Sequence, residues 1–400
     1  MRPADFTLAA GPITVPAETL QALGSPILYH YDPAFIERFR ATEERIAAIY
    51  GTTSHEIILM QGEAVLGLEA AARAIVRPGM ACLNLVSGIF GKYFGYWLTA
   101  MGAELHEIEV PYDESIDPDV VAAYLDAHPG IEMLAVVHSE TPSGTLNPVR
   151  ELGPICRSRG VVTIVDCVSS FGGAELRPQE WQLDLLVAGP QKCLGGPPGM
   201  SLMAVSDEAW ALIEKNPDAP RGSFLSMLDY REQWHGAGKF PFTPSVSDLH
   251  GVDAAAALLL EEGVDASIAR HARVAAACRA GAQAMGVRLW PAREEIAAPC
   301  VTSLRVPDGL TDIAVRDHAR SRYGVQFSGG QGAGPIIRIG HMGAMARPMY
   351  PIVGLAALGR TFVDLGVPVD VGGGVAAAME ALSAGAGDAE EALIAAGLGA

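Results

Sequence analysis

The sequence has 400 residues, of which half are apolar and 18% are charged. This composition is typical of a globular enzyme with a large buried core, and it excludes a disordered chain. The formal net charge of −18 argues against nucleic acid or an anionic membrane surface as a partner.

The N-terminal residues and the cysteines indicate the cellular compartment. The first residues contain no apolar run of signal-peptide length, and no stretch is long and apolar enough to span a bilayer. The six cysteines show no CxxC spacing, which is typical of buried thiols in a reducing compartment. We therefore expect a cytoplasmic protein, and we predict no metal ion in its site.

An irregular segment opens the chain before the first predicted helix. Residues 8–35 contain several Gly and Pro residues, and Tyr31 lies in a polar and aromatic loop at residues 29–35. Such a loop lines a pocket or a subunit contact, or it packs as an ordinary surface loop. Apolar residues at helical spacing then predict a helix over residues 36–50.

From residue 57 onward, short apolar strands alternate with helices. Strands are predicted at residues 57–60, 81–86, 107–110, 133–138, 161–165 and 184–187. Helices are predicted at residues 64–75, 90–101, 117–128 and 149–158. This alternation predicts a doubly wound α/β domain with a mostly parallel sheet, in which ligands bind at the carboxyl ends of the strands.

The C-terminal part has a different pattern. After a less regular stretch, the predicted elements are a long Ala-rich helical region at 252–285, strands at 301–306 and 336–340, and a helix at 313–322. The tail from residue 371 is Gly/Ala-rich, contains one amphipathic helical stretch and is expected to fray. We predict two domains, a large one over residues 1–264 and a smaller α+β one over residues 265–400.

Lys192 has unusual surroundings for a lysine. It lies in a run of Gly, Pro and apolar residues, and no other charged residue occurs between residues 184 and 207. An apolar environment lowers the pKa of a lysine, which then attacks a carbonyl as a neutral amine near pH 7. The sequence therefore predicts a Schiff-base lysine, and a buried structural lysine at a tight turn is the alternative.

Two further charged residues lie in or at the end of apolar strands. Asp166 ends the strand that precedes the lysine's own strand, where a carboxylate can keep a pyridine nitrogen protonated. The alternative for Asp166 is an N-cap or turn aspartate. Arg338 is the only charged residue of the strand at 336–340. A buried arginine needs an acidic partner, either a substrate carboxylate or a carboxylate of the protein.

Two turns that follow strands carry candidate ring contacts. Phe90 lies in the Gly-containing turn at residues 87–92, where it stacks on a planar ring or packs in the core. Thr141 lies in the turn Glu-Thr-Pro-Ser-Gly-Thr at residues 140–145, where its hydroxyl binds a ring hydroxyl or belongs to an ordinary polar turn.

Together, these stretches resemble the class V aminotransferases, which are fold-type I pyridoxal-phosphate enzymes. The resemblance rests on the spacing of Asp166 and Lys192, on the run Gly-Pro-Gln-Lys-Cys-Leu-Gly-Gly-Pro-Pro-Gly, and on the segment Arg-Ile-Gly-His-Met-Gly that begins at Arg338. It implies a mostly parallel, doubly wound sheet in a large domain and a smaller α+β domain. It also implies a homodimer, or a dimer of dimers, with active sites at the subunit interface.

Within this class, the chain is similar to the members that use free vitamin B6 as a substrate and convert pyridoxamine and pyruvate to pyridoxal and L-alanine. The similar stretches are residues 28–35, 62–69, 95–97, 141–145, 166–173 and 240–246. This resemblance implies a Schiff base of pyridoxal on Lys192, with Asp166 at the ring nitrogen. The other implied residues are Glu63, Phe90, Thr141, Gln191 and Thr243 for the ring, and Arg338, Tyr31 and Gln331 for the amine and keto-acid substrates.

Glu63 supports the use of a vitamer without phosphate. In phosphate-binding relatives, small residues, hydroxyls and backbone amides at this helix start hold the phosphate. A carboxylate there satisfies the helix dipole and repels a phosphate dianion by on the order of a few kcal/mol at ~4 Å. We expect Glu63 to accept a hydrogen bond from a hydroxymethyl group, and an ordinary helix-start glutamate is the alternative. Relatives also supply a phosphate-binding tyrosine from the partner subunit, and Phe240 matches that position.

Two departures from these B6 transaminases affect the expected substrate. Phe90 stands where they have a tyrosine, and Gln331 lies near the position of a second carboxylate-binding arginine. The loss of one charged contact weakens keto-acid binding by roughly 1–3 kcal/mol or changes the keto acid. Three other functions stay open: a conventional class V aminotransferase with bound pyridoxal 5′-phosphate, of the alanine–glyoxylate or serine–pyruvate type; a pyridoxal-phosphate lyase; and a non-catalytic B6-binding protein.

Overall fold

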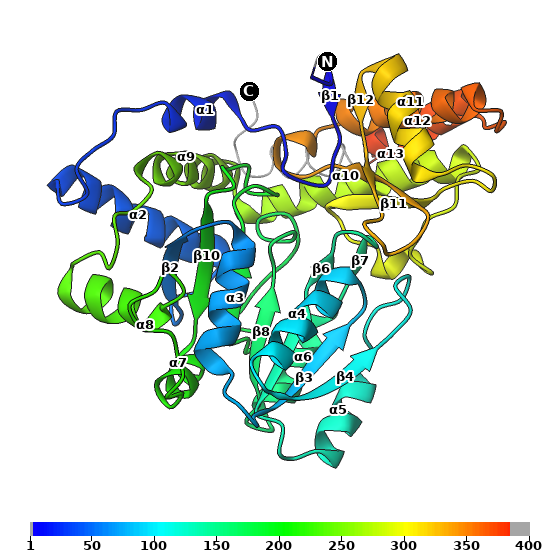
Figure 1. Cartoon of the computed structure of the whole chain (residues 1–400). Coiled ribbons are helices and arrows are strands. Elements are labelled where there is room, and N and C mark those ends of the chain that lie inside the picture. The colour runs from blue at the N-terminus through cyan, green and yellow to red at the C-terminus, as the bar shows by residue number, and fades with distance from the viewer. Residues whose placement is uncertain (1–2, 385–400) are drawn as a thin grey trace.

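A mixed seven-stranded sheet forms the centre of the molecule (Figure 1). The computed structural model describes residues 3–384. The strand order is β2-β10-β9-β8-β5-β3-β4, in which β10 is antiparallel to both neighbours and the other pairs are parallel. These strands are β2 (Glu56–Gln61), β3 (Ala81–Val86), β4 (Glu104–Glu109), β5 (Met133–Val137), β8 (Val162–Asp166), β9 (Leu185–Ala188) and β10 (Met200–Val205).

Helices cover both faces of this sheet, because successive strand residues point to opposite faces. Leu59 belongs to the core cluster on one face, and its neighbour Met60 belongs to the cluster on the other. The first cluster includes residues of α2 (Pro33–Tyr50), α5 (Pro118–Ala127), α6 (Val149–Arg157) and α9 (Val246–Glu262). The second includes residues of α3 (Ala64–Ile75), α4 (Ile89–Ala100) and α7 (Asp207–Glu214). The predicted doubly wound, mostly parallel α/β architecture is confirmed.

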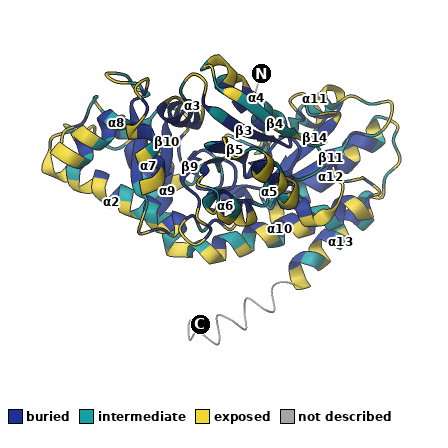
Figure 2. Ribbon diagram, turned by 90° about the horizontal axis from the view of Figure 1, so that it is seen from below, coloured by how far each residue is buried: buried dark blue, intermediate teal, exposed yellow. Residues whose placement is uncertain are grey.

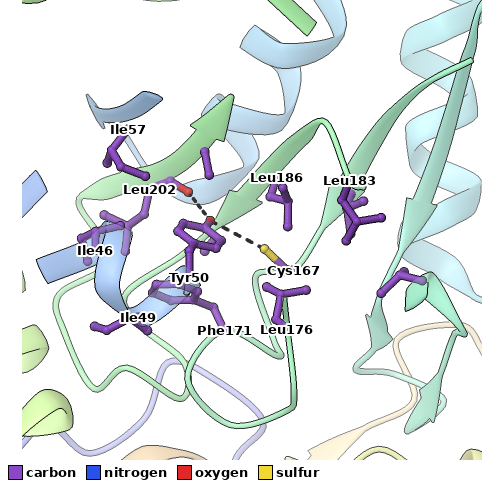
Figure 3. Packing of buried hydrophobic residues seen from close by; sticks show 14 of the residues in the cluster. Ile46, Ile49, Tyr50, Ile57, Cys167, Phe171, Leu176, Leu183, Leu186 and Leu202 are labelled. Carbon is purple, nitrogen blue, oxygen red and sulfur yellow. Dashed lines mark hydrogen bonds between the residues drawn. The ribbon is translucent and has the colours of Figure 1, made fainter. Parts of the chain in front are cut away.

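Tyr50 anchors α2 to the sheet. Its side chain is fully buried, its hydroxyl donates to the Leu202 carbonyl at 2.9 Å, and its ring packs 4.4 Å from that of Phe171 (Figure 3).

Buried residues concentrate in the central strands, whereas the outer faces of α2 and α10 (Val264–Ala284) are exposed (Figure 2). The strands therefore provide a rigid frame for the loops at their ends.

The C-terminal part builds a second core. An antiparallel sheet in the order β11-β14-β13 packs with four helices in one cluster, which Leu8 also joins. The strands are β11 (Val301–Arg305), β13 (Ser328–Gly329) and β14 (Ile336–Gly340), and the helices are α10, α11 (Asp312–Tyr323), α12 (Met349–Asp364) and α13 (Val371–Ala384). Strand β1 (Phe6–Thr7) pairs with β12 (Val325–Gln326), so the start of the chain packs on this part. The domain boundary at residues 264/265 stays a prediction.

The structure differs from the predicted elements in several places. The helical region at 252–285 is two helices, because Gly263 adopts a φ of +92° between α9 and α10. The sequence pattern also does not predict strand β10 or the helices α1 (Ala17–Leu23), α7 and α12. Helix α12 contains Gly354 and Gly359, which disfavour a helix locally, yet both glycines lie where a Cβ would come within 3 Å of a neighbouring side chain.

The remaining elements are short. They are α1 (Ala17–Leu23), β6 (Ser139–Glu140), β7 (Thr145–Leu146), α8 (Met227–Asp229), a π-helical segment at Tyr230–Gly236, and 3₁₀ helices at Glu294–Ile296 and Gly343–Met345. The tail predicted to fray begins as α13, and its part beyond residue 384 lies outside the described residues. Within residues 3–384, no helix has the length and apolarity needed to cross a membrane.

Candidate active site

Four adjacent strands bring the predicted ring-binding residues to one edge of the sheet. In the order β9-β8-β5-β3 the strands are parallel, so their carboxyl ends lie side by side. Lys192 follows β9, Asp166 ends β8, Thr141 lies just after β5 and Phe90 follows β3. The structure therefore brings these four predicted residues together.

Lys192 lies in a Gly- and Pro-rich turn beside the N-terminal segment. Its Nζ donates to the carbonyl of Ala10 at 2.7 Å. A Cβ on Gly11 would lie 2.5 Å from Lys192 Cδ, and Gly11 has a φ of +107°, so only glycine fits there. Burial and then the charge of Arg338 lower the pKa of Lys192 to about 8. A substantial fraction of the amine is therefore neutral and nucleophilic near pH 7 to 8.

Asp166 presents one free carboxylate oxygen. Its Oδ1 accepts from the backbone N–H of Val168 at 2.9 Å, and among the described residues Oδ2 has no hydrogen-bond donor. Burial raises the pKa of Asp166 to about 6, against the lowering effects of Val168 N–H and Lys192. A protonated ring nitrogen would supply the missing donor and a positive charge.

Ser169 connects Thr141 to the loop that follows Asp166. The two hydroxyls of Thr141 and Ser169 hydrogen-bond, and the Ser169 carbonyl accepts from the Cys193 thiol at 3.3 Å. The turn that carries Thr141 is thus tied to both the aspartate loop and the lysine loop.

Glu63 caps the start of α3 and is bonded by two donors. Its Oε2 accepts from Val65 N–H at 2.9 Å, and its Oε1 accepts from the side-chain amide of Gln191 at 2.6 Å. Gly62, with a φ of +127°, allows the chain to pass over Leu66, since a Cβ would lie 2.1 Å from Leu66 Cδ2. Gln191, predicted from sequence, therefore holds the carboxylate of Glu63 in place.

Arg338 is buried, and it has no acidic partner in the part of the chain that the structure describes. It is 3% exposed, its Nε donates to the Gly329 carbonyl at 2.7 Å, and no carboxylate within residues 3–384 forms an ion pair with it. Burial and then Arg316 lower the pKa of Arg338 to about 10. The alternative of an intramolecular ion pair is thus not found, and the rest of the guanidinium is available to a carboxylate ligand.

Three predicted residues do not join this group within one chain. Gln331 is exposed on the loop before β14, in a left-handed conformation with a φ of +51°. Tyr31 contacts the rings of Tyr29, His30 and Phe240, and Thr243 lines a surface pocket with His30. Among the described residues, none of the three forms a hydrogen bond, ion pair or ring contact with Lys192, Asp166 or Arg338.

Phe240 matches a position from which relatives supply a tyrosine to the partner subunit's site, but here it lies inside its own chain. Its side chain is 7% exposed and stacks on Trp234 at 4.2 Å between ring centroids. Its ring therefore belongs to the core of its own chain.

Two site features escaped the sequence analysis. The carbonyl of Ala10 binds Lys192, while Ala10 N–H donates to Ser328 Oγ at 3.0 Å, so the N-terminal segment links the lysine to the strand pair that carries Arg338. Glu140, the residue before Thr141, is fully buried beside the start of α4. Gly11 and Pro12, which disfavour regular secondary structure, were the only local signal for the contact of Ala10 with Lys192. No local signal indicated the burial of Glu140.

Comparison with known proteins identifies the family. The family model described as "Aminotransferase class-V" matches residues 18–347. The chain belongs to the class V aminotransferases. This aminotransferase is 47% identical to pyridoxamine–pyruvate transaminase of Mesorhizobium japonicum over 383 residues, which covers 95% of the chain and 97% of the relative. Its identity to (S)-ureidoglycine–glyoxylate transaminase of Bacillus subtilis is 27% over 398 residues, 93% of the chain and 94% of the relative.

Solved structures agree with this assignment. The crystal structure of pyridoxamine-pyruvate aminotransferase from Mesorhizobium loti matches with a TM-score of 0.93 and 45% identity, over 96% of the chain and 98% of that structure. The structure of ureidoglycine-glyoxylate aminotransferase from Bacillus subtilis matches with a TM-score of 0.90 and 27% identity, over 96% and 99%. The predicted fold type I and the predicted enzyme class are confirmed for this aminotransferase.

Proposed function

We propose that this aminotransferase transfers an amino group between pyridoxamine and pyruvate to give pyridoxal and L-alanine, and that it takes the B6 vitamer as a substrate without a phosphate group. The similarity to the Mesorhizobium transaminase supports the reaction. The position of Glu63 at the start of α3 is the observation that supports a vitamer without phosphate.

The donors that a phosphate would need at this helix start are already occupied. Val65 N–H and the Gln191 amide donate to the Glu63 carboxylate. Leu66 N–H donates to the Glu63 carbonyl at 2.7 Å, and Gly67 N–H donates to Ser201 Oγ at 3.1 Å. A phosphate dianion would therefore meet a carboxylate instead of free N–H groups, whereas a hydroxymethyl group brings its own donor.

The other residues fit a pyridine ring and a small keto acid. When bound, the ring supplies an electron sink for the chemistry at the amino carbon. Asp166 Oδ2 holds the proton at the ring nitrogen, Thr141 fixes the ring hydroxyl and Phe90 stacks on the ring face. Lys192 Nζ would bind the aldehyde carbon, and once the amino substrate has displaced it, the free amine would move the proton between the substrate α-carbon and C4′. Arg338 binds the keto-acid carboxylate, with Gln331 as a second contact.

We infer a cytoplasmic homo-oligomer in which Tyr31 and Thr243 reach the site of the neighbouring subunit. The loop that carries Tyr31 exposes large apolar side chains, with Ile27 77%, Tyr29 65% and Tyr31 40% exposed. Surfaces of this kind suit subunit contacts. The same arrangement would explain why neither residue meets Lys192 within one chain.

The pH dependence of pyridoxal binding follows from the lowered pKa of Lys192. Only the neutral amine attacks the aldehyde, so the rate of the absorbance change on mixing with pyridoxal should rise as the pH passes through about 8. Stopped-flow mixing between pH 6 and 10 measures this rate. A midpoint near the ordinary lysine pKa would contradict the buried environment of the amine.

Substitution of Glu63 tests the choice of vitamer. Glu63→Ser removes the carboxylate and frees Val65 N–H and the Gln191 amide, so the ratio of the Kd for pyridoxal to that for pyridoxal phosphate should rise by about 10–100-fold. Equilibrium absorbance titrations with each vitamer measure the two constants. The control is Glu69→Ser on the same helix, which removes an exposed pair with Arg73 and should leave the ratio unchanged.

The first experiment is a titration of the purified wild-type protein with pyridoxal and, separately, with pyridoxal phosphate. We expect a colourless protein that yellows with pyridoxal, binds it more tightly than the phosphate, and forms alanine from pyridoxamine and pyruvate. A protein that is yellow as purified and releases pyridoxal phosphate on denaturation would instead be a conventional class V aminotransferase.

A further inference from the structure

Glu140 is a buried carboxyl group that contacts no cationic side chain within residues 3–384. It lies in β6, directly after β5, and is 0% exposed. The pKa of Glu140 is affected by burial, by two backbone N–H groups and by the nearby Asp166, and by no Lys, Arg or His side chain of the described residues. Burial raises the pKa of Glu140 to about 7, against the lowering effect of the two N–H groups. Burying a carboxyl group without a cationic partner destabilises the fold, which indicates that the contacts of Glu140 serve a function.

Both oxygens of Glu140 bind the start of α4. Oε1 accepts from Gly91 N–H at 2.7 Å, and Oε2 accepts from Phe90 N–H at 3.3 Å. These N–H groups are free in the first turn of any helix, and the helix dipole favours a negative charge beside them. The carboxylate thus replaces the missing cap, because the N-cap residue is Gly88, which has no side chain to do so.

The chain around Phe90 is shaped to admit this carboxylate. A Cβ on Gly88 would lie 2.5 Å from Glu140 Cδ, and a Cβ on Gly91 would lie 3.3 Å from Oε1 and 2.9 Å from the Leu85 carbonyl. Gly88 has a φ of −179°, which any residue can adopt. Glycine is therefore required at this position because a Cβ would clash with Glu140, and not because of the backbone conformation.

The same short hairpin carries both Glu140 and the ring-binding Thr141. Thr141 is fixed by Ser169, next to Asp166, while Glu140 is fixed to Phe90. We propose that Glu140 is a positioning residue that holds Phe90 in register against the face of the bound pyridine ring. This proposal rests on the proposed function only in requiring a B6 ring at Lys192, with or without a phosphate group.

The substitution Glu140→Gln tests the contact without changing its volume. The amide keeps one acceptor and turns the other into a donor, so one of the two N–H groups loses its partner. We expect the Kd for pyridoxal, measured by absorbance titration at a pH above the pKa of about 7 of Glu140, to increase by about 10-fold. Gly88→Ala should have the same effect with Glu140 intact, since the added methyl group displaces the carboxylate. If Glu140→Gln does not fold, Gly88→Ala decides the question by the same titration.

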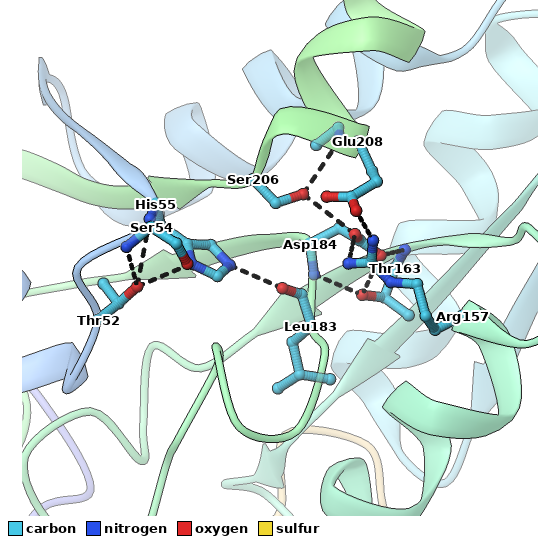
Figure 4. A network of polar contacts seen from close by, with 10 residues as sticks. Thr52, Ser54, His55, Arg157, Thr163, Leu183, Asp184, Ser206 and Glu208 are labelled. Carbon is cyan, nitrogen blue, oxygen red and sulfur yellow. Dashed lines mark hydrogen bonds and ion pairs between the residues drawn. The ribbon is translucent and has the colours of Figure 1, made fainter.

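A second buried carboxylate provides the matched control. Asp184, 1% exposed, accepts from the N–H and the hydroxyl of Thr163 and from Ser206, and pairs with Arg157, at the opposite end of β9 from the lysine (Figure 4). Asp184→Asn should lower the urea midpoint of unfolding without changing the Kd for pyridoxal. A purely structural Glu140 would behave in the same way, and that result would overturn the proposal.

A double-mutant cycle separates action through Phe90 from a general loss of structure. In a Phe90→Leu background, Glu140→Gln should weaken pyridoxal binding by less than about 3-fold, because the ring that Glu140 positions is gone. Independent, multiplicative effects would overturn the proposal. If the wild-type protein binds pyridoxal phosphate instead of pyridoxal, the proposed vitamer is wrong, and the same cycle run with pyridoxal phosphate still tests Glu140.

Discussion

Lys192→Ala should reduce alanine formation from pyridoxamine and pyruvate by at least about 10³-fold, because the variant lacks the group that moves the proton. The amine lies at the carboxyl end of β9, its pKa is lowered to about 8, and the N-terminal segment fixes it at Ala10. Lys92 also follows a strand of this sheet edge, but it pairs with Glu107 and Glu109, which raise its pKa, so it cannot take over the transfer as a neutral amine. Single-turnover measurements with pyridoxamine and excess pyruvate report the loss directly.

The control for this variant is Lys215→Ala, which removes an exposed lysine after α7 and should retain full activity. The variant Lys192→Ala should also bind pyridoxal without the yellow absorbance of the wild type. Added methylamine should restore part of the activity by entering the space of the lost side chain. Retention of more than about a tenth of the wild-type rate would exclude Lys192 as the proton carrier.

The residues that could be predicted from the sequence are those that follow a strand. Lys192, Asp166, Thr141 and Phe90 each come at or just after a short apolar run, and parallel strands bring such positions to one edge of a sheet. The local pattern was therefore enough to group them, although the order of the strands was not visible. Strand β10, which runs antiparallel between β2 and β9, was missed because its apolar run follows the Gly/Pro-rich lysine turn without a helix.

Contacts between distant segments could not be predicted in the same way. Ala10 meets Lys192 through a backbone carbonyl, which any residue possesses, and Glu140 meets Phe90 through backbone N–H groups. Neither contact leaves a residue-type signal on both sides. The same reasoning applies to Gln191, whose bond to Glu63 joins the lysine turn to the start of α3. Only the family resemblance indicated Gln191, and the structure supplies the reason for its position.

Arg338→Met should lower kcat/KM for pyruvate by about 10²–10³-fold, because it removes the one buried guanidinium that the described residues leave without a carboxylate partner. Methionine is flexible, of similar length and apolar, so it fills the space in β14 without burying a new unpaired polar group. The loss should appear mainly in KM for pyruvate, while the Kd for pyridoxal changes little at a pH where Lys192 is already neutral. Steady-state kinetics with varied pyruvate and direct titration with pyridoxal separate the two effects.

The same variant carries a second, independent signature at Lys192. The charge of Arg338 is the second cause, after burial, of the lowered pKa of Lys192. Its removal should therefore raise that pKa, and the midpoint of the pH dependence of pyridoxal binding should move above about 8. Arg316→Met is the matched control, because Arg316 lies near Arg338 but pairs with Asp312 at 2.9 Å. If both variants weaken pyruvate binding equally, the effect is a general loss of positive charge, and Arg338 does not bind the carboxylate directly.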